Sequence, residues 1–151
     1  MPVISYGLLV YKVEGGQTMV LLAHPSGPFF ASKDNWTIPK GEPDHIEEPL
    51  TTARREFSEE TGLRLPDNCE LIDLGELRQS SVKTNHIWAL NCDPDLNAFS
   101  SNTFELEWPP HSGRRQTYYE IDRVNWFDAK TAKTKLFPSQ RDFIDRLMAA
   151  L

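Results

Sequence analysis

Apolar residues in the first third of the chain fall into the short runs that are typical of β-strands. Residues 3–13 and 18–23 are apolar and β-prone, and the turn-forming residues 14–17 separate them, which predicts a β-hairpin. The proline- and glycine-containing segment 24–35 is expected to be a loop. Residues 36–38 are expected to form a short strand.

One helix is predicted over residues 49–61. Proline suits its first turn, Gly62 suits the position after its last turn, and no proline interrupts it. Two strands over 70–78 and 82–92 are expected to follow, with a turn between them. Residues 93–116 contain three prolines and a glycine and are expected to be mostly loop.

The C-terminal quarter predicts a strand over 121–127 and a short helix over 128–136. Ser139 and Asp142 have the spacing of a cap for a final helix, in which Phe143 and Leu147 recur at the i, i+4 interval. This order of elements predicts the α/β class, as a sandwich of helices around a mixed sheet. The length of 151 residues predicts a single domain over 1–151.

Composition narrows the classes of function. The formal net charge of −6 argues against a bulk nucleic-acid binder, so phosphate chemistry would need a local cation. No apolar run is long enough for a membrane span, and the N-terminus lacks the pattern of a secretory signal. The two cysteines are too few for a disulfide scaffold. We therefore expect a reduced, cytoplasmic environment.

The predicted helix over 49–61 concentrates acidic residues. At 100° per residue, Glu56, Glu59 and Glu60 share one face about 100° wide, beside a separate apolar stripe. Like charges at i, i+4 are destabilising, and these lie near the negative end of the helix dipole. A divalent cation would reverse this cost, and carboxylate oxygens suit Mg²⁺ or Mn²⁺.

A glutamate-rich helix face is more often simply solvated, so the wider spacing matters. Residues 41–63 fit the pattern G-x5-E-x7-R-E-U-x-E-E-x-G-U, with U apolar. Seven matched residues would occur by chance on the order of 10⁻⁸ per start position. The segment resembles the Nudix box. Residues 101–115 resemble a bacterial Nudix subgroup predicted to hydrolyse nucleoside triphosphates to pyrophosphate.

This resemblance implies roles for the residues of the box. Glu59 and Glu60 would be the principal metal ligands, Glu56 a further ligand or the base, and the Gly41 carbonyl a further donor. Arg55 would orient the glutamates, and Glu47 would pair with it. The implied cofactor is Mg²⁺ or Mn²⁺.

For each candidate residue outside the box, a role in the site competes with a simpler structural explanation. Glu120 would be an extra acidic ligand or an exposed loop carboxylate. Lys40, Arg114 and Arg115 would bind substrate phosphates or be solvated. The aromatic residues that could stack on a base are more simply explained by core packing; they are Phe29, Phe30 and Trp36.

The resemblance implies a metal-dependent hydrolase of a nucleoside diphosphate linked to another group. The expected substrate is a nucleoside triphosphate or a related small nucleotide, with a dinucleoside polyphosphate as the alternative. A non-catalytic nucleotide-sensing module on the same fold is the competing class. The expected partners are a small nucleotide and a second copy in a homodimer, with no nucleic acid and no membrane.

Overall fold

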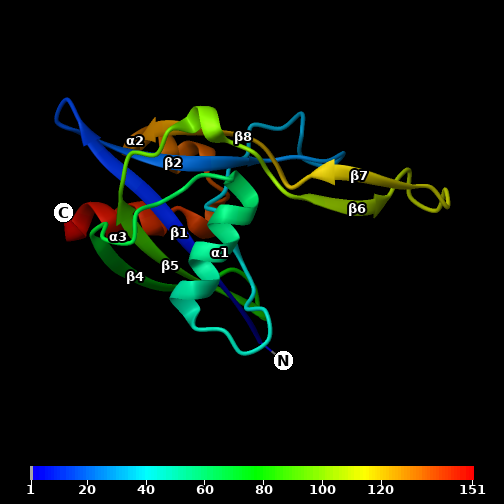
Figure 1. Cartoon of the computed structure of the whole chain (residues 1–151), viewed down its shortest axis with the longest axis horizontal. Helices are drawn as coiled ribbons and strands as arrows, with labels where there is room; N and C mark the ends of the chain where they lie inside the picture. Colours follow the sequence, from blue (N-terminus) through cyan, green and yellow to red (C-terminus); the bar gives the residue numbers. More distant parts are fainter. Residues whose placement is uncertain (1) are drawn as a thin grey trace.

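The computed structural model describes residues 2–151. It contains a six-stranded sheet with helices on both faces and a separate two-stranded hairpin that projects to one side (Figure 1). The strands of the sheet are β1 (Val3–Glu14), β2 (Gln17–Pro25), β3 (Lys40–Gly41), β4 (Leu71–Arg78), β5 (Lys83–Asn91) and β8 (Ile121–Asp128). The hairpin consists of β6 (Thr103–Glu107) and β7 (Arg115–Tyr119). The helices are α1 (Pro49–Thr61), α2 (Ala129–Lys135) and α3 (Asp142–Ala150), with short 3-10 turns η1 (Leu96–Ala98) and η2 (Pro138–Gln140).

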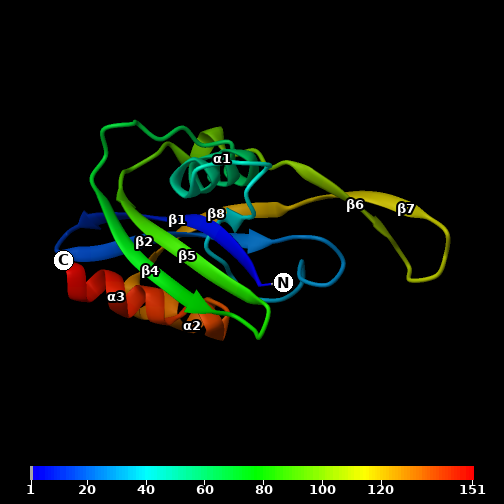
Figure 2. The ribbon, with the colours of Figure 1, turned by 90° about the horizontal axis from the view of Figure 1, so that it is seen from below.

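The sheet is mixed. Its strand order is β4-β5-β1-β2-β8, and β3 pairs with β1. β1 runs parallel to β5, while its pairings with β2 and β3 are antiparallel. Helix α1 covers one face, and α2 and α3 cover the other (Figure 2). The predicted α/β sandwich around a mixed sheet is confirmed.

Strand β1 explains why the first apolar run is nearly continuous. Leu8 and Val10 point into the core beneath α1, while Leu9 and Tyr11 point into the core beneath α2 and α3. All four are at most 1% exposed. A central strand that is covered on both faces has no solvent side, so its alternating positions are all apolar.

Helix α1 has the predicted bounds. Pro49 lies in its first turn, and the residue after its end, Gly62, has φ of 67° in the left-handed region. Ala53 and Phe57 bury its apolar stripe against the sheet. This packing fixes the rotation of the helix and turns its acidic face toward β3.

The segment 93–116, which was predicted to be mostly loop, is irregular over more than half of its length but also contains regular structure. η1, β6 and the first residues of β7 lie within it. Phe104 and Leu106 alternate with Thr103, Glu105 and Glu107, which is the period of two that a strand requires. Pro109, Pro110 and Gly113, which suggested a loop, lie in the turn of the hairpin, whereas Pro94 precedes η1.

Two shorter predictions also need correction. The expected strand over 36–38 is reduced to isolated bridges, in which Thr37 pairs with Ala23 and Trp36 with Leu136. Ser139 does not cap the last helix, because it lies inside η2 and Arg141 precedes α3 without a capping side chain. The predicted short helix over 128–136 is present as α2.

The aromatic candidates divide between core and surface. Trp36 is 4% exposed and packs in the core, as expected. Phe29 and Phe30 are 52% and 36% exposed, so core packing is the wrong interpretation for both. Within residues 2–151, the structure has no helix of the length and apolar character needed to cross a membrane.

Candidate functional site

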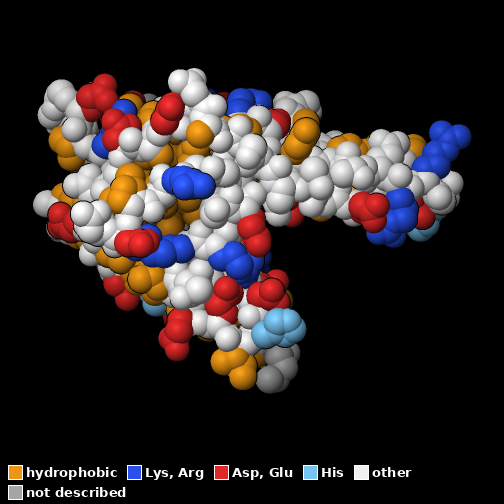
Figure 3. All heavy atoms as spheres, viewed as in Figure 1, with side chains coloured by type: hydrophobic (Ala, Val, Ile, Leu, Met, Phe, Trp, Pro, Cys, Tyr) orange, Lys and Arg blue, Asp and Glu red, His pale blue; other side chains and the backbone are white. Residues whose placement is uncertain are grey.

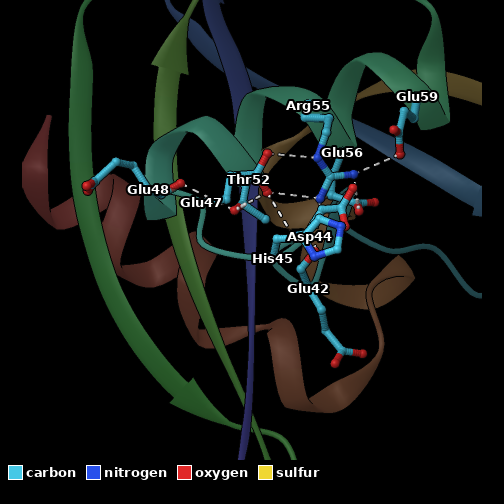
Figure 4. A network of polar contacts seen from close by, with 9 residues as sticks. All are labelled: Glu42, Asp44, His45, Glu47, Glu48, Thr52, Arg55, Glu56 and Glu59. Carbon is cyan, nitrogen blue, oxygen red and sulfur yellow. Dashed lines mark hydrogen bonds and ion pairs between the residues drawn. The ribbon is translucent and has the colours of Figure 1, made fainter.

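Arg55 is the centre of a hydrogen-bond network on α1 (Figure 4). Its Nε and Nη2 donate to the two carboxylate oxygens of Glu47 at 3.0 and 3.1 Å. Its Nη1 donates to Glu56 Oε1 at 2.9 Å and to Glu59 Oε2 at 3.1 Å. Nη2 also reaches the Glu42 carbonyl at 3.0 Å. The planar guanidinium thereby holds three carboxylates at set angles, which an ammonium could not do.

Glu47 is held from three directions. Besides Arg55, its Oε1 accepts from Thr52 Oγ1 at 2.7 Å and from the Asp44 backbone N–H at 3.1 Å. These donors, Arg55 first, lower the pKa of the Glu47 carboxyl to about 2. The carboxylate is therefore charged throughout the neutral range. It fixes the loop before α1 to the helix.

Gly41 brings the backbone of β3 against Glu56. A Cβ atom at this position would collide with the Glu56 carboxyl group, so the close approach requires glycine. β3 reaches this place because Lys40 and Gly41 pair with Gly7 and Tyr6 of β1. The strand and the helix together confine the Glu56 carboxylate.

Glu56, Glu60 and Glu120 form a cluster of acidic side chains, although Glu120 is 60 residues further along the chain than Glu60. Burial raises the pKa of each of the three carboxyl groups. Arg55 opposes this rise at Glu56, and Lys40 opposes it at Glu60. The negative charges of Glu56 and Glu120 add to the rise at Glu60. Arg55 and Lys40 thus offset the burial of Glu56 and Glu60 in part, and no neighbouring cation offsets that of Glu120.

A cavity of about 610 Å³ opens beside this cluster. Lys40, Glu60 and Glu120 line one part of it. Phe30 and Phe137 line another part, with their ring centroids 5.9 Å apart. The cavity is large enough for a drug-sized ligand and combines an apolar wall with a few charged groups, as ligand sites commonly do.

The residues present fit a divalent cation. Glu60 is 8% exposed, and its buried Oε2 has no hydrogen-bond partner. A buried carboxylate oxygen without a donor is costly, and a cation would satisfy it. Among residues 2–151, no three acidic, histidine or cysteine side chains are already arranged as a complete metal site. Glu59 instead points to Arg55.

The structure brings together most of the sequence candidates, but it separates two of them. Gly41, Glu56, Glu60, Lys40 and Glu120 converge at the cavity or its edge. The two that it separates from the site are Arg114 and Arg115. They lie at the turn of the β6–β7 hairpin, since Arg115 is opposite Glu107 at the last register position. Figure 1 shows this turn far from α1.

Sequence reasoning missed several residues of the site. Thr52 supports Glu47, and its only signal was a polar position at the edge of the apolar stripe of α1. Phe137 and Gln79 line the cavity from segments distant in sequence. No local pattern marks such residues, because only the packing of η2 and of the β4–β5 turn against the sheet places them there.

Two curated relatives match the chain. One, from Bartonella henselae, is named RNA pyrophosphohydrolase and is 39% identical over 64 residues, which are 40% of this chain and 35% of that protein. The other, from Myxococcus xanthus, is named octanoyltransferase and is 30% identical over 151 residues, which are 98% of this chain and 37% of that protein. The chain thus spans little more than a third of the length of either relative.

A solved structure shares the fold. The Nudix domain of NrtR from Shewanella oneidensis, in complex with ADP-ribose, has a TM-score of 0.66, 13% identity, and coverage of 99% of this chain and 88% of that one. A family model described as NUDIX domain matches residues 1–147. Together with the box over residues 41–63, this match shows that the chain belongs to the Nudix family.

Proposed function

We propose that this chain is a single-domain Nudix pyrophosphohydrolase that cleaves a phosphoanhydride bond in a small nucleotide. The proposal depends mainly on one observation: the buried, partnerless Oε2 of Glu60 lies in an acidic cluster at the edge of a nucleotide-sized cavity. A nucleoside triphosphate or a related small nucleotide is the substrate class that we favour. We place this activity in the cytoplasm.

The acidic residues would hold the cofactor. Glu56, Glu59 and Glu60, with the Gly41 carbonyl, are the proposed ligands, and Glu120 lies beside them at the position just before β8. Mg²⁺ or Mn²⁺ would supply positive charge to the phosphate oxygens and activate a water molecule. Glu59 would then exchange its bond to Arg55 for the cation.

The side chains around the cavity would accept the proton, bind the phosphates and pack against the nucleobase. Water attacks one phosphorus, the bridging P–O bond breaks, and a carboxylate of the cluster accepts the proton that the water loses. The Lys40 ammonium offers a positive charge at the cavity wall, where phosphate oxygens would lie. Phe30 and Phe137 offer apolar surface for the nucleobase.

A substrate panel tests this proposal. The full chain with Mg²⁺ would be assayed against nucleoside triphosphates, dinucleoside polyphosphates, nucleotide sugars, ADP-ribose and a 5′-triphosphorylated oligoribonucleotide. The oligoribonucleotide is included because one relative carries the name RNA pyrophosphohydrolase. We expect the highest kcat/KM for a nucleoside triphosphate.

Two variants accompany the panel. Glu60→Gln should lower kcat about a thousandfold, since the charge stabilisation supplied by a metal is worth several kcal/mol. Glu14→Gln is the control, because it makes the same change from carboxylate to amide at the end of β1, where the Glu14 side chain is 70% exposed. It should leave kcat unchanged. Nucleotide binding without turnover by the wild-type protein would contradict the proposal and favour a sensing module.

A further inference from the structure

The two cysteines of the chain lie opposite each other, just beyond the pairing of β4 with β5. The antiparallel register of these strands places Leu71 opposite Leu90. Continued by two residues along each chain segment, the same register places Cys69 opposite Cys92. Both cysteine side chains pack against the core beneath α1, together with Leu71 and Leu90. Positions two residues apart share one face of a strand, so the two thiols lie on the same side of the sheet.

The backbone hydrogen bonds show which type of cross-strand pair the cysteines form. The Asn91 N–H donates across the strands to the Glu70 carbonyl at 3.0 Å. The Cys92 N–H points the other way and donates to the Tyr11 carbonyl of β1 at 3.0 Å. Opposite residues alternate between hydrogen-bonded and non-hydrogen-bonded pairs, and Cα atoms in the second kind are about 4.5 Å apart. A disulfide joins residues whose Cα atoms are about 4.4–6.8 Å apart, so Cys69 and Cys92 are close enough to be bridged.

The two thiols already contact each other. A side-chain hydrogen bond joins Cys92 to Cys69. Burial in the first place, and this hydrogen bond in the second, raise the pKa of the Cys92 thiol to about 11. Cys92 therefore keeps its proton at neutral pH, and we assign the first attack on a reagent to Cys69.

A small reagent can reach this pair. Both cysteines are half-buried, and neither forms a disulfide in the structure. Figure 3 shows hydrophobic side chains at the surface to the left of α1, on the side where the segment after that helix crosses to β4 in Figure 1. Fully buried cysteines are inert, so partial exposure distinguishes this pair from cysteines that serve only in packing.

The pair lies between two segments that both adjoin the end of α1. Residues 62–70 run from that end to β4, and residues 92–102 run from β5 to the β6–β7 hairpin. The second segment binds the helix directly, since the Asn102 N–H donates to the Glu59 carbonyl at 2.9 Å. A bond between the two sulfur atoms would therefore fasten these two segments to each other.

We propose that Cys69 and Cys92 are a reversible modification site that reacts with a small disulfide and closes into a cross-strand disulfide bond. The Cys69 thiolate attacks one sulfur of the reagent, a mixed disulfide forms, and the first small thiol leaves. The Cys92 sulfur then attacks the Cys69 sulfur, gives its proton to solvent, and releases the second small thiol. The cysteines together lose two electrons and two protons, and the reagent gains them as it becomes two thiols. In a reducing compartment the site is open, and it closes when small disulfides accumulate.

Equilibration of the full chain in buffers of oxidised and reduced glutathione tests the closure. We expect the intact mass to fall by two hydrogen atoms, with no glutathione retained, and excess reductant to reverse the change. The matched control is the same chain unfolded in urea, because it has the same thiols without the strand register. The equilibrium constant for closure should be at least about a hundredfold larger in the native chain, as the entropy of closing a loop over residues 69–92 predicts.

Thermal unfolding gives an independent measurement on the same samples. The closed chain should have a Tm about 5–10 °C above that of the reduced chain, because the bond restricts the unfolded state. Equal closure constants in the native and unfolded chains, a closed chain that melts at or below the Tm of the reduced one, or retention of glutathione on both cysteines would each overturn the proposal.

Two single variants test the order of attack. Cys92→Ser keeps the attacking thiol without its partner and should accumulate one glutathione per chain. Cys69→Ser should react at least about tenfold more slowly, because burial still holds the proton on Cys92. A faster reaction of Cys69→Ser than of Cys92→Ser would overturn the assignment of Cys69 as the attacking thiol.

Discussion

Arg55 illustrates how one side chain fixes the geometry of several others. It forms hydrogen bonds with Glu47, Glu56 and Glu59 and with the Glu42 carbonyl. Each bond uses a different direction of the guanidinium plane. The role that the sequence resemblance gave to Arg55 is therefore physically available, and it depends on the shape of the group as much as on its charge.

Replacing Arg55 with lysine tests this dependence on shape. Arg55→Lys keeps the charge but loses the forked geometry, so Glu56 and Glu59 should lose their fixed orientation. We expect kcat and Mn²⁺ affinity to fall about 10- to 100-fold, as for other residues that orient metal ligands. Arg54→Lys is the control, because Arg54 lines a different hollow beside Phe57 and Leu63. Equal effects of the two substitutions would contradict the assignment.

Glu47 gives a pH-dependent prediction. Its pKa in the folded chain is about 2, below its ordinary value of 4.5. A depressed pKa contributes stability that is present above the unfolded-state pKa and is lost as pH falls toward the folded-state pKa. The difference in Tm between wild type and Glu47→Gln should therefore be largest near pH 6 and should shrink steadily from pH 5 to pH 3. A difference that is constant over this range would show that Glu47 acts only by packing.

At the scale of elements, the end of α1 joins the helix to the base of the β6–β7 hairpin. The Ser100 N–H donates to the Thr61 carbonyl at 2.9 Å, directly beside Gly62. A Cβ atom at Gly62 would lie 2.7 Å from the Ser100 carbonyl oxygen. Glycine is needed here both for its backbone conformation and for the space that it leaves.

Gly62→Ala should therefore destabilise the chain through two effects. The left-handed backbone conformation costs about 1–2 kcal/mol for a residue with a Cβ atom, and the overlap with Ser100 adds to it. Gly15→Ala provides the control, since Gly15 has φ of 59° and no heavy atom within 4 Å of the added Cβ. Urea unfolding should show a larger loss of unfolding free energy for Gly62→Ala. Equal losses would mean that the contact with Ser100 relaxes freely.

At the scale of the whole molecule, the cavity is assembled from distant segments. Lys40 comes from β3, Glu60 from α1 and Phe137 from the segment before η2. Phe30 comes from the loop after β2 and is 36% exposed. The Phe30 ring therefore lies at the cavity wall and is only partly buried. An exposed apolar side chain at this place is expected for a surface that receives a ligand.

Removing the Phe30 ring should affect substrate binding more than chemistry. Stacking of a base on an aromatic ring is worth about 1–3 kcal/mol, so Phe30→Ala should raise KM for the preferred nucleotide about 5- to 150-fold with kcat nearly unchanged. Met148→Ala removes a side chain of similar exposure (44%) from α3 and should change neither constant. A fall in kcat without a change in KM would place Phe30 in the reacting part of the site.

Local sequence was sufficient for the features whose physics is local. Periodicity and end signals predicted α1 with its bounds, and the spacing of Glu56, Glu59 and Glu60 predicted their shared face, because both depend only on helix geometry. Tertiary structure alone decided that Glu120 joins these glutamates and that Phe30 and Phe137 form a wall. It also decided that Arg114 and Arg115 extend away from the site. Contacts between residues distant in sequence depend on how the sheet and its connections pack, and no short pattern along the chain encodes that packing.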